Sequence, residues 1–130
     1  FAGLTHRQAR IAALFGKIES FEPSERILTF GEVGHEVCIV VEGVVVAQVE
    51  RDEGNRVLRA IHPGELFGEV ALFTGTRTAN IDAMTNVRVL RLNRESLERI
   101  QNRYPKIAAQ IFWNLTGTVS ERLADVTTRI

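Results

Sequence analysis

The chain has 130 residues, of which 45% are hydrophobic and 25% are charged. This length suits one domain and is enough to bury a hydrophobic core without disulfides or metals. The 16 Lys and Arg residues balance 16 Asp and Glu residues, which argues against nucleic acid as the main partner, because nucleic-acid-binding domains usually carry a basic excess.

The first segment predicts a helix that begins at Leu4 and ends before Gly16, with Thr5 and Gln8 spaced as a capping box. From there to Leu92, short apolar segments alternate with turn residues, a pattern typical of an antiparallel barrel or jelly roll. The strands we expect cover residues 17–21, 26–30, 37–42, 44–51, 57–61, 77–84 and 87–92.

After Leu92 the helical period returns. Asn93 is an expected N-cap for a helix through Arg103, and Pro105 is expected to begin a second helix that runs to Ile130. Apolar residues, mostly four apart, follow one face of this second helix and fit a dimer seam, a core face or a lid. They are Ile107, Ile111, Leu115, Val119, Leu123, Val126 and Ile130.

We therefore expect a single domain over residues 1–130, with a helix at 4–16, a β-barrel at 17–92 and C-terminal helices at 93–130. Cys38 is the only cysteine, and we expect it to be a buried thiol in a reducing compartment. No apolar run approaches the length that spans a bilayer, so we expect a cytoplasmic domain, free or as the cytosolic part of a membrane protein. The missing initiator Met suggests an excerpt of a larger protein.

The segment 67–79 carries the chemistry. Residues 69–72 predict one helical turn, whose unsatisfied N–H groups favour an anion, and Gly68 lets a ligand approach the backbone because it has no Cβ. The guanidinium of Arg77 can grip two phosphate oxygens, and the carboxylate of Glu69 can accept from ribose hydroxyls. Taken singly, a glycine such as Gly68 more often marks a turn, and an arginine near a glutamate more often forms a surface ion pair. Together they predict a site for a nucleotide whose phosphate lies close to its sugar.

This segment resembles the phosphate-binding cassette of the cyclic-nucleotide-binding domain family. The family includes catabolite activator protein, the regulatory subunits of cAMP-dependent kinase, cGMP-dependent kinase and nucleotide-gated channels. Its pattern is Phe-Gly-Glu, an aliphatic residue, a small residue and Leu, then a short loop and Arg, a small residue and Ala. Residues 67–72 match the first part, and Arg77, Thr78 and Ala79 match the second.

The similarity extends beyond the cassette, because Gly31 and Gly43 match two earlier turn glycines of the family in spacing and the terminal helices also fit. It covers roughly residues 4–125. The resemblance implies a mainly β fold with flanking helices, a double-stranded β-helix (jelly-roll) barrel. It also implies a regulatory domain without catalysis, which binds a cyclic mononucleotide and passes the signal through its C-terminal helix to an effector in the parent protein.

By resemblance, Glu69 would accept the ribose 2′-hydroxyl and Arg77 would pair with the cyclic phosphate. Backbone N–H groups of Gly68, Glu69 and Ala71 would complete the phosphate cradle, and Thr78 would reach the phosphate or the base. The remaining implied nucleotide-binding residues are Val70 and Ala79, with an apolar pocket wall of Val57, Leu58, Phe67 and Leu72. The lid is expected at Leu115, Val119, Arg122 and Leu123. For the apolar wall residues, core packing is the alternative role.

We expect cAMP ahead of cGMP as the ligand. A Thr at position 78 resembles cGMP-dependent kinases, where it favours guanine, yet some cAMP-preferring channels also have it. The loop from Leu72 to Arg77 is one residue shorter than in many relatives. Loop length varies within the family, so this difference affects the expected geometry of the cassette and not the assignment to the family.

The main alternative is a sensor of the same fold that has another ligand or none and acts in protein interaction or dimerisation. The presence of both Glu69 and Arg77 argues against it. A metal-dependent enzyme would need clustered histidines, but His6, His35 and His62 include no His-x-His pair. The expected partners are therefore a cyclic mononucleotide, an effector domain and a second copy of the chain, with no nucleic acid on this segment.

Overall fold

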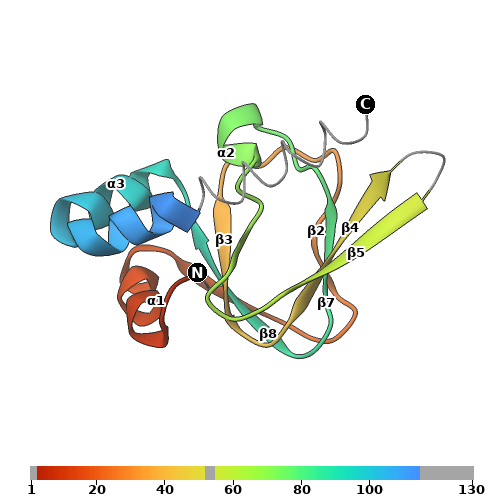
Figure 1. Cartoon of the computed structure of the whole chain (residues 1–130), viewed down its shortest axis with the longest axis horizontal. Helices are drawn as coiled ribbons and strands as arrows, with labels where there is room; N and C mark the ends of the chain where they lie inside the picture. The colour runs from red at the N-terminus through yellow and green to blue at the C-terminus, as the bar shows by residue number, and fades with distance from the viewer. Residues whose placement is uncertain (1–2, 52–54, 115–130) are drawn as a thin grey trace.

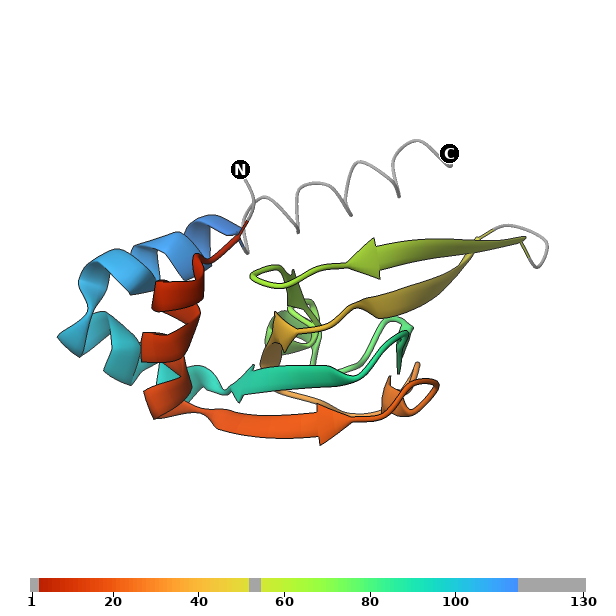
Figure 2. The same cartoon turned by 90° about the horizontal axis from the view of Figure 1, so that it is seen from below.

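The computed structural model describes residues 3–51 and 55–114. Within them, two four-stranded sheets face each other, α1 and α3 lie together at one end, and the short α2 lies at one edge (Figures 1 and 2). In chain order the elements are α1 (His6–Ala12), a 3₁₀ turn (Ala13–Phe15), β1 (Lys17–Phe21), β2 (Arg26–Leu28), β3 (Val37–Glu42), β4 (Val45–Arg51), β5 (Asn55–Ile61), β6 (Leu66–Phe67), α2 (Ala71–Thr74), β7 (Asn80–Ala83), β8 (Val87–Leu92) and α3 (Arg94–Arg103). A further helix covers 105–114.

The first sheet has the order β1-β8-β3-β6, and its strand β3 is buried on both faces over residues 37–40. Side chains alternate along each strand, so Ile39 and Leu90 face the helices, whereas Cys38 and Val89 face the second sheet. This double burial explains why β3 is an unbroken apolar run rather than an alternating one. The prediction that Cys38 is buried is confirmed.

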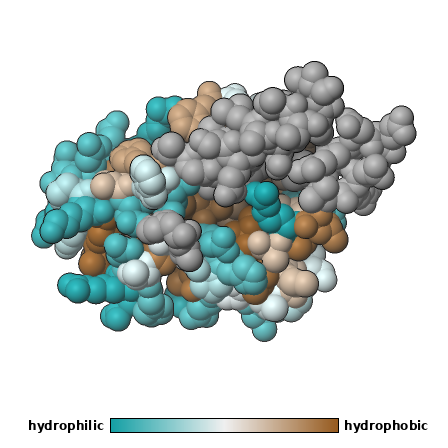
Figure 3. All heavy atoms as spheres, viewed as in Figure 1, coloured by the Kyte–Doolittle hydropathy of each residue, from teal (hydrophilic) through white to brown (hydrophobic). Residues whose placement is uncertain are grey.

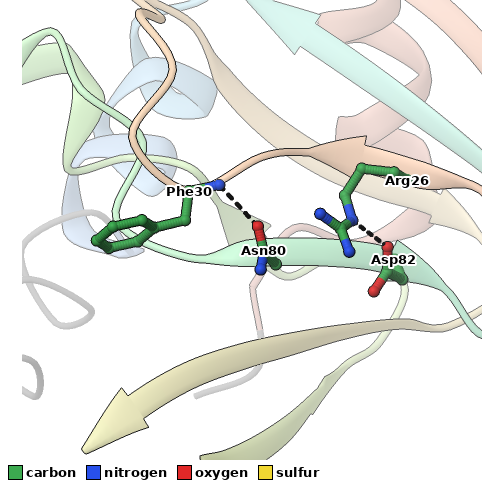
Figure 4. Close-up of polar contacts among 4 residues, drawn as sticks. All are labelled: Arg26, Phe30, Asn80 and Asp82. Atoms are coloured by element: carbon green, nitrogen blue, oxygen red, sulfur yellow. Dashed lines mark hydrogen bonds and ion pairs between the residues drawn. The ribbon is translucent and has the colours of Figure 1, made fainter.

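The second sheet has the order β2-β7-β4-β5 and buries one face. Val45, Ala47 and Ile81 point into the core between the sheets. On the outer face, two side chains of β7 bind β2 and the residues that follow it, as Figure 4 shows. Asp82 pairs with the guanidinium of Arg26, and Asn80 accepts a hydrogen bond of 2.8 Å from the N–H of Phe30. These contacts fix the strand that follows the predicted cassette.

The helices form their own core against the first sheet. Asn93 caps α3 by accepting from the N–H of Ser96, as its position in the sequence predicted. Ile107 and Ile111 are buried in the same cluster as Ile100 of α3, so the first part of the predicted apolar stripe is core. The later residues of that stripe, from 115 on, lie outside the described residues.

The predicted jelly-roll fold with flanking helices is confirmed, and within the described residues its two sheets remain separate layers. The capping box of Thr5 and Gln8 is present. The strand predicted for 77–84 is wrong over its first three residues, since β7 begins only at Asn80. Arg77 instead bonds through its backbone to the loop at Gly31 and Glu32.

Polar residues dominate the surface over the α3 end in Figure 3, and hydrophobic side chains reach the surface nearer the centre of the same face. Among the helices that the structure describes, none has both the length and the apolar character needed to cross a membrane.

Candidate functional site

A small pocket, partly open to solvent, lies between the cassette and the second sheet. It brings together seven residues that the sequence predicted for one site and two apolar residues that it did not. The lining consists of Leu28, Gly68, Glu69, Val70, Ala71, Arg77, Thr78, Ala79 and Ile81.

The path of the cassette follows from its local backbone geometry. β6 pairs Phe67 with Cys38 and ends there, and Gly68 has a φ of +73°, which turns the chain into α2 with a conformation that other residues adopt only at a cost. α2 starts two residues later than the predicted turn, at Ala71. As the first residue of the helix, Ala71 has an N–H with no intrahelical acceptor, and this residue lines the pocket.

Arg77 is set rigidly into this pocket and is only 5% exposed. Its Nη1 donates to the carbonyl oxygens of Glu36, at 2.8 Å, and Gly68, at 3.0 Å. The side-chain hydrogen bonds of Arg77 to the described residues both come from Nη1. A buried guanidinium held by neutral carbonyls is costly unless an anion compensates its charge.

Glu69 lines the same pocket and is 0% exposed. Carboxylates are rarely buried so completely unless they serve an ion pair or a ligand. The two charged residues on which the sequence prediction depends therefore face a common cavity. Thr78, on the rim of this cavity, is exposed.

The remaining predicted site residues lie elsewhere. Phe67 and Leu72 are buried core residues, which was the alternative role. Leu58 as a pocket wall is wrong: it pairs with Gln48, lies on the opposite face of β5 from the buried Ile61, and is 63% exposed. Val57 pairs with Val49, and its side chain lies outside the described residues. Arg122 and Leu123 lie outside them as well.

Sequence reasoning missed Gly34, which borders the Arg77 side chain. A Cβ added to Gly34 would lie 2.2 Å from Nε of Arg77, so any other residue there would displace the guanidinium. No local signal in the sequence indicates this role of Gly34, because the contact joins segments far apart in the chain. Leu28 and Ile81 were also missed as pocket residues, although both lie on the inner face of the strands that contain them.

The other candidate chemistries gain no support from the described residues. No group of three or more His, Cys, Asp or Glu side chains is placed there to hold a metal ion. Burial raises the pKa of the Cys38 thiol to about 12, although the charges of Arg91 and Arg77 act in the opposite direction. This thiol is therefore protonated and poorly nucleophilic at neutral pH.

The site is a pocket in a jelly-roll fold, lined by a buried guanidinium that can pair with an anion such as a phosphate. The family model for the cyclic nucleotide-binding domain matches residues 18–104, and the chain belongs to this family of regulatory, signal-sensing domains.

Human cGMP-dependent protein kinase 2 is 29% identical over 111 residues, which cover 85% of this chain and 14% of the kinase. Mouse potassium/sodium hyperpolarization-activated cyclic nucleotide-gated channel 2 is 31% identical over 90 residues, which cover 68% of this chain and 10% of the channel. The chain thus spans only a small part of the length of these relatives.

Among solved structures, Thermus thermophilus catabolite activator protein matches with a TM-score of 0.74 and 26% identity, over 97% of this chain and 58% of that one. The CprK protein in complex with o-chlorophenolacetic acid matches with a TM-score of 0.76 but only 21% identity, over 93% of this chain and 50% of that one, which shows the shared fold alone. A fold does not by itself identify a ligand, so the choice of ligand depends on the pocket.

Proposed function

We propose that this chain is a ligand-sensing domain that binds a cyclic mononucleotide, cAMP or cGMP, in the pocket at residues 68–79. The observation that carries the proposal is the buried guanidinium of Arg77, which shares one cavity with the buried carboxylate of Glu69. A cation for the phosphate and an acceptor for the sugar, in one small pocket, fit a ligand whose phosphate is closed onto its ribose.

The phosphate half of the ligand belongs at Arg77 and Ala71. Nη1 of Arg77 is engaged with carbonyls, which leaves Nε and Nη2 for phosphate oxygens. Charge-assisted bonds of this kind are about twice as strong as neutral ones. The first N–H groups of α2 add donors to the same anion.

The sugar and base occupy the rest of the pocket. Glu69 accepts the ribose 2′-hydroxyl, and the apolar side chains of Leu28, Ala79 and Ile81 line the inner wall. Phosphate and ribose are common to both cyclic nucleotides, so only the base distinguishes them. The expected order, cAMP ahead of cGMP, stays a prediction, although the hydroxyl of Thr78 and the similarity to a cGMP-dependent kinase favour cGMP.

The proposed output of the domain is an effector in the same parent protein, reached through the segment that follows α3. Arg122 and Leu123 of that segment remain the expected lid residues, and the segment is also the expected surface for a second copy. This segment itself acts on no nucleic acid and catalyses no reaction. The buried, unpaired Cys38 fits a cytoplasmic location.

Calorimetric titration with cAMP, cGMP and linear 5′-AMP tests the proposal. We expect Arg77→Ala to weaken binding of both cyclic nucleotides by about 10- to 100-fold, the loss of a charge-assisted contact. Arg26→Ala is the matched control, because that arginine pairs with Asp82 on the outer face of the sheet, and it should bind as the unchanged chain does. Unchanged affinity in Arg77→Ala, or no binding to the unchanged chain, favours the alternative of a sensor with another ligand.

A further inference from the structure

The guanidinium of Arg94 joins the cassette to α3. Nη2 of Arg94, in the first turn of α3, donates to the carbonyl oxygen of Leu72 in α2 at 2.5 Å. The two residues are far apart in sequence, and neither belongs to the strands that hold the two sheets together. This bond is therefore a direct polar link between the candidate site and the helical layer.

The carbonyl that Arg94 binds is one that α2 cannot satisfy internally. The last carbonyls of any helix lack intrahelical donors. In α2, Val70 O accepts from the N–H groups of Phe73 and Thr74, and Ala71 O accepts from that of Gly75. For Leu72 O, Arg94 is the donor that the described residues provide, and a cation also complements the negative end of the helix dipole.

The side chain of Leu72 makes a second link at the same place. It is buried in the cluster that includes Leu97 and Ile100 of α3 and Ile107 of the following helix. α3 itself is anchored at its start, since Asn93 accepts from both the N–H and the hydroxyl of Ser96. A displacement of α2 would therefore act on the N-terminal end of α3, which is fixed by its cap.

We propose that Arg94 is the positioning residue that couples occupancy of the pocket to the position of α3, by holding the C-terminal end of α2 through the carbonyl of Leu72. The inference rests on the proposed function, because the input is a nucleotide at the opposite end of α2. That helix is a single turn with the pocket at its start and Arg94 at its end, so a movement of the cassette onto a phosphate changes the Arg94 contact. A coupling of this kind requires that the ligand favour one position of α3 over another.

The test uses Trp113 as an internal probe, because it is the only tryptophan and is 67% exposed on the helix that follows α3. Its fluorescence is recorded with and without saturating cAMP or cGMP, in parallel with hydrogen exchange of the α3 amides. The variants are Arg94→Met, which removes the donor, Arg94→Lys, which keeps a cation, and Arg103→Gln, an exposed arginine at the other end of α3, as the control.

We expect nucleotide to change the Trp113 signal and α3 exchange in the unchanged chain and in Arg103→Gln. In Arg94→Met most of this change should disappear, while affinity falls by no more than about fivefold, the lower end of known couplings. Arg94→Lys should recover part of the change, and it keeps the test informative if Arg94→Met does not fold.

A full response in Arg94→Met at saturation overturns the inference, as does an equal loss in Arg103→Gln, which would reflect general weakening of α3. Nucleotide binding without any response of α3 in the unchanged chain also overturns it and leaves the proposed function intact. If the unchanged chain binds neither nucleotide, the proposed function itself fails.

Discussion

Gly34 lies against the guanidinium of Arg77 with no room for a side chain between them. A Cβ on Gly34 would stand 2.2 Å from Nε and 2.5 Å from Cζ of Arg77. The same loop binds Arg77 from the backbone, because Arg77 N–H donates to Glu32 O at 2.8 Å and Gly31 N–H donates to Arg77 O at 2.9 Å. The loop before β3 thus determines where this guanidinium points.

The first prediction is that Gly34→Ala weakens binding of cAMP and cGMP by at least about tenfold, because the added methyl group displaces a charge-assisted donor. Gly31→Ala is the control. Gly31 has a φ of +84° and open space around its Cβ position, so this change should cost about 1–2 kcal/mol of stability without a clash with the guanidinium, and it should lower affinity less than Gly34→Ala does. Calorimetry and urea unfolding separate the two effects. Equal affinity losses in both variants would show that general strain in the loop, and not displacement of the Arg77 guanidinium, weakens binding.

A second prediction concerns the buried carboxylate of Glu69. In the unchanged chain, 2′-deoxy-cAMP should bind about 10- to 100-fold more weakly than cAMP, since a bond to a charged acceptor is lost. In Glu69→Gln the acceptor is neutral, and this penalty should shrink by about fivefold. Asp82→Asn, on the outer face, should leave the penalty unchanged. A penalty that is the same with Glu69 and with Gln places the 2′-hydroxyl elsewhere.

Third, we expect Thr78→Ala to lower the affinity for cGMP more than that for cAMP. Thr78 is exposed on the rim of the pocket, where its hydroxyl can contact the base edge. One neutral hydrogen bond corresponds to about 2- to 10-fold in affinity. Competition titrations of the variant with both nucleotides measure the difference. An equal loss for the two ligands would contradict a contact with the base and assign the hydroxyl to the phosphate that they share.

The fourth prediction is a pH dependence of stability caused by Cys38. An unfolded thiol titrates near pH 8.5, whereas burial raises the pKa of Cys38 to about 12. Between these values the unfolded chain releases a proton that the folded chain retains, so the free energy of unfolding falls as the pH rises. Urea unfolding at about pH 7.5 and about pH 10.5 should show a smaller loss for Cys38→Ala than for the unchanged chain. Equal losses would mean that the thiol titrates normally.

Much of the fold could be predicted because its cause is local. The apolar run of β3 and the caps at Thr5 and Asn93 are visible along the chain. The cassette was also predictable, since its residues lie within one short segment that a family pattern describes.

The predictions were wrong where contacts between distant segments determine the position of a residue. Leu58 was assigned to the pocket, but the pairing of β5 with β4 turns it outward, and a shift of one residue in register reverses every side chain. The strand predicted to begin at Arg77 starts later because the backbone of that residue bonds to the loop at 31–32. The role of Gly34 depends on the same long-range contact.

The most direct test of the central claim is nuclear magnetic resonance of the ¹⁵N-labelled chain during titration with cAMP and with cGMP. We expect saturable shifts of the Arg77 Nε–H signal and of the Gly68 and Ala71 amides, with the dissociation constant found by calorimetry. The Arg26 Nε–H signal on the outer face should not shift. Binding that leaves the Arg77 signal in place, or that shifts Arg26 instead, would contradict the central claim.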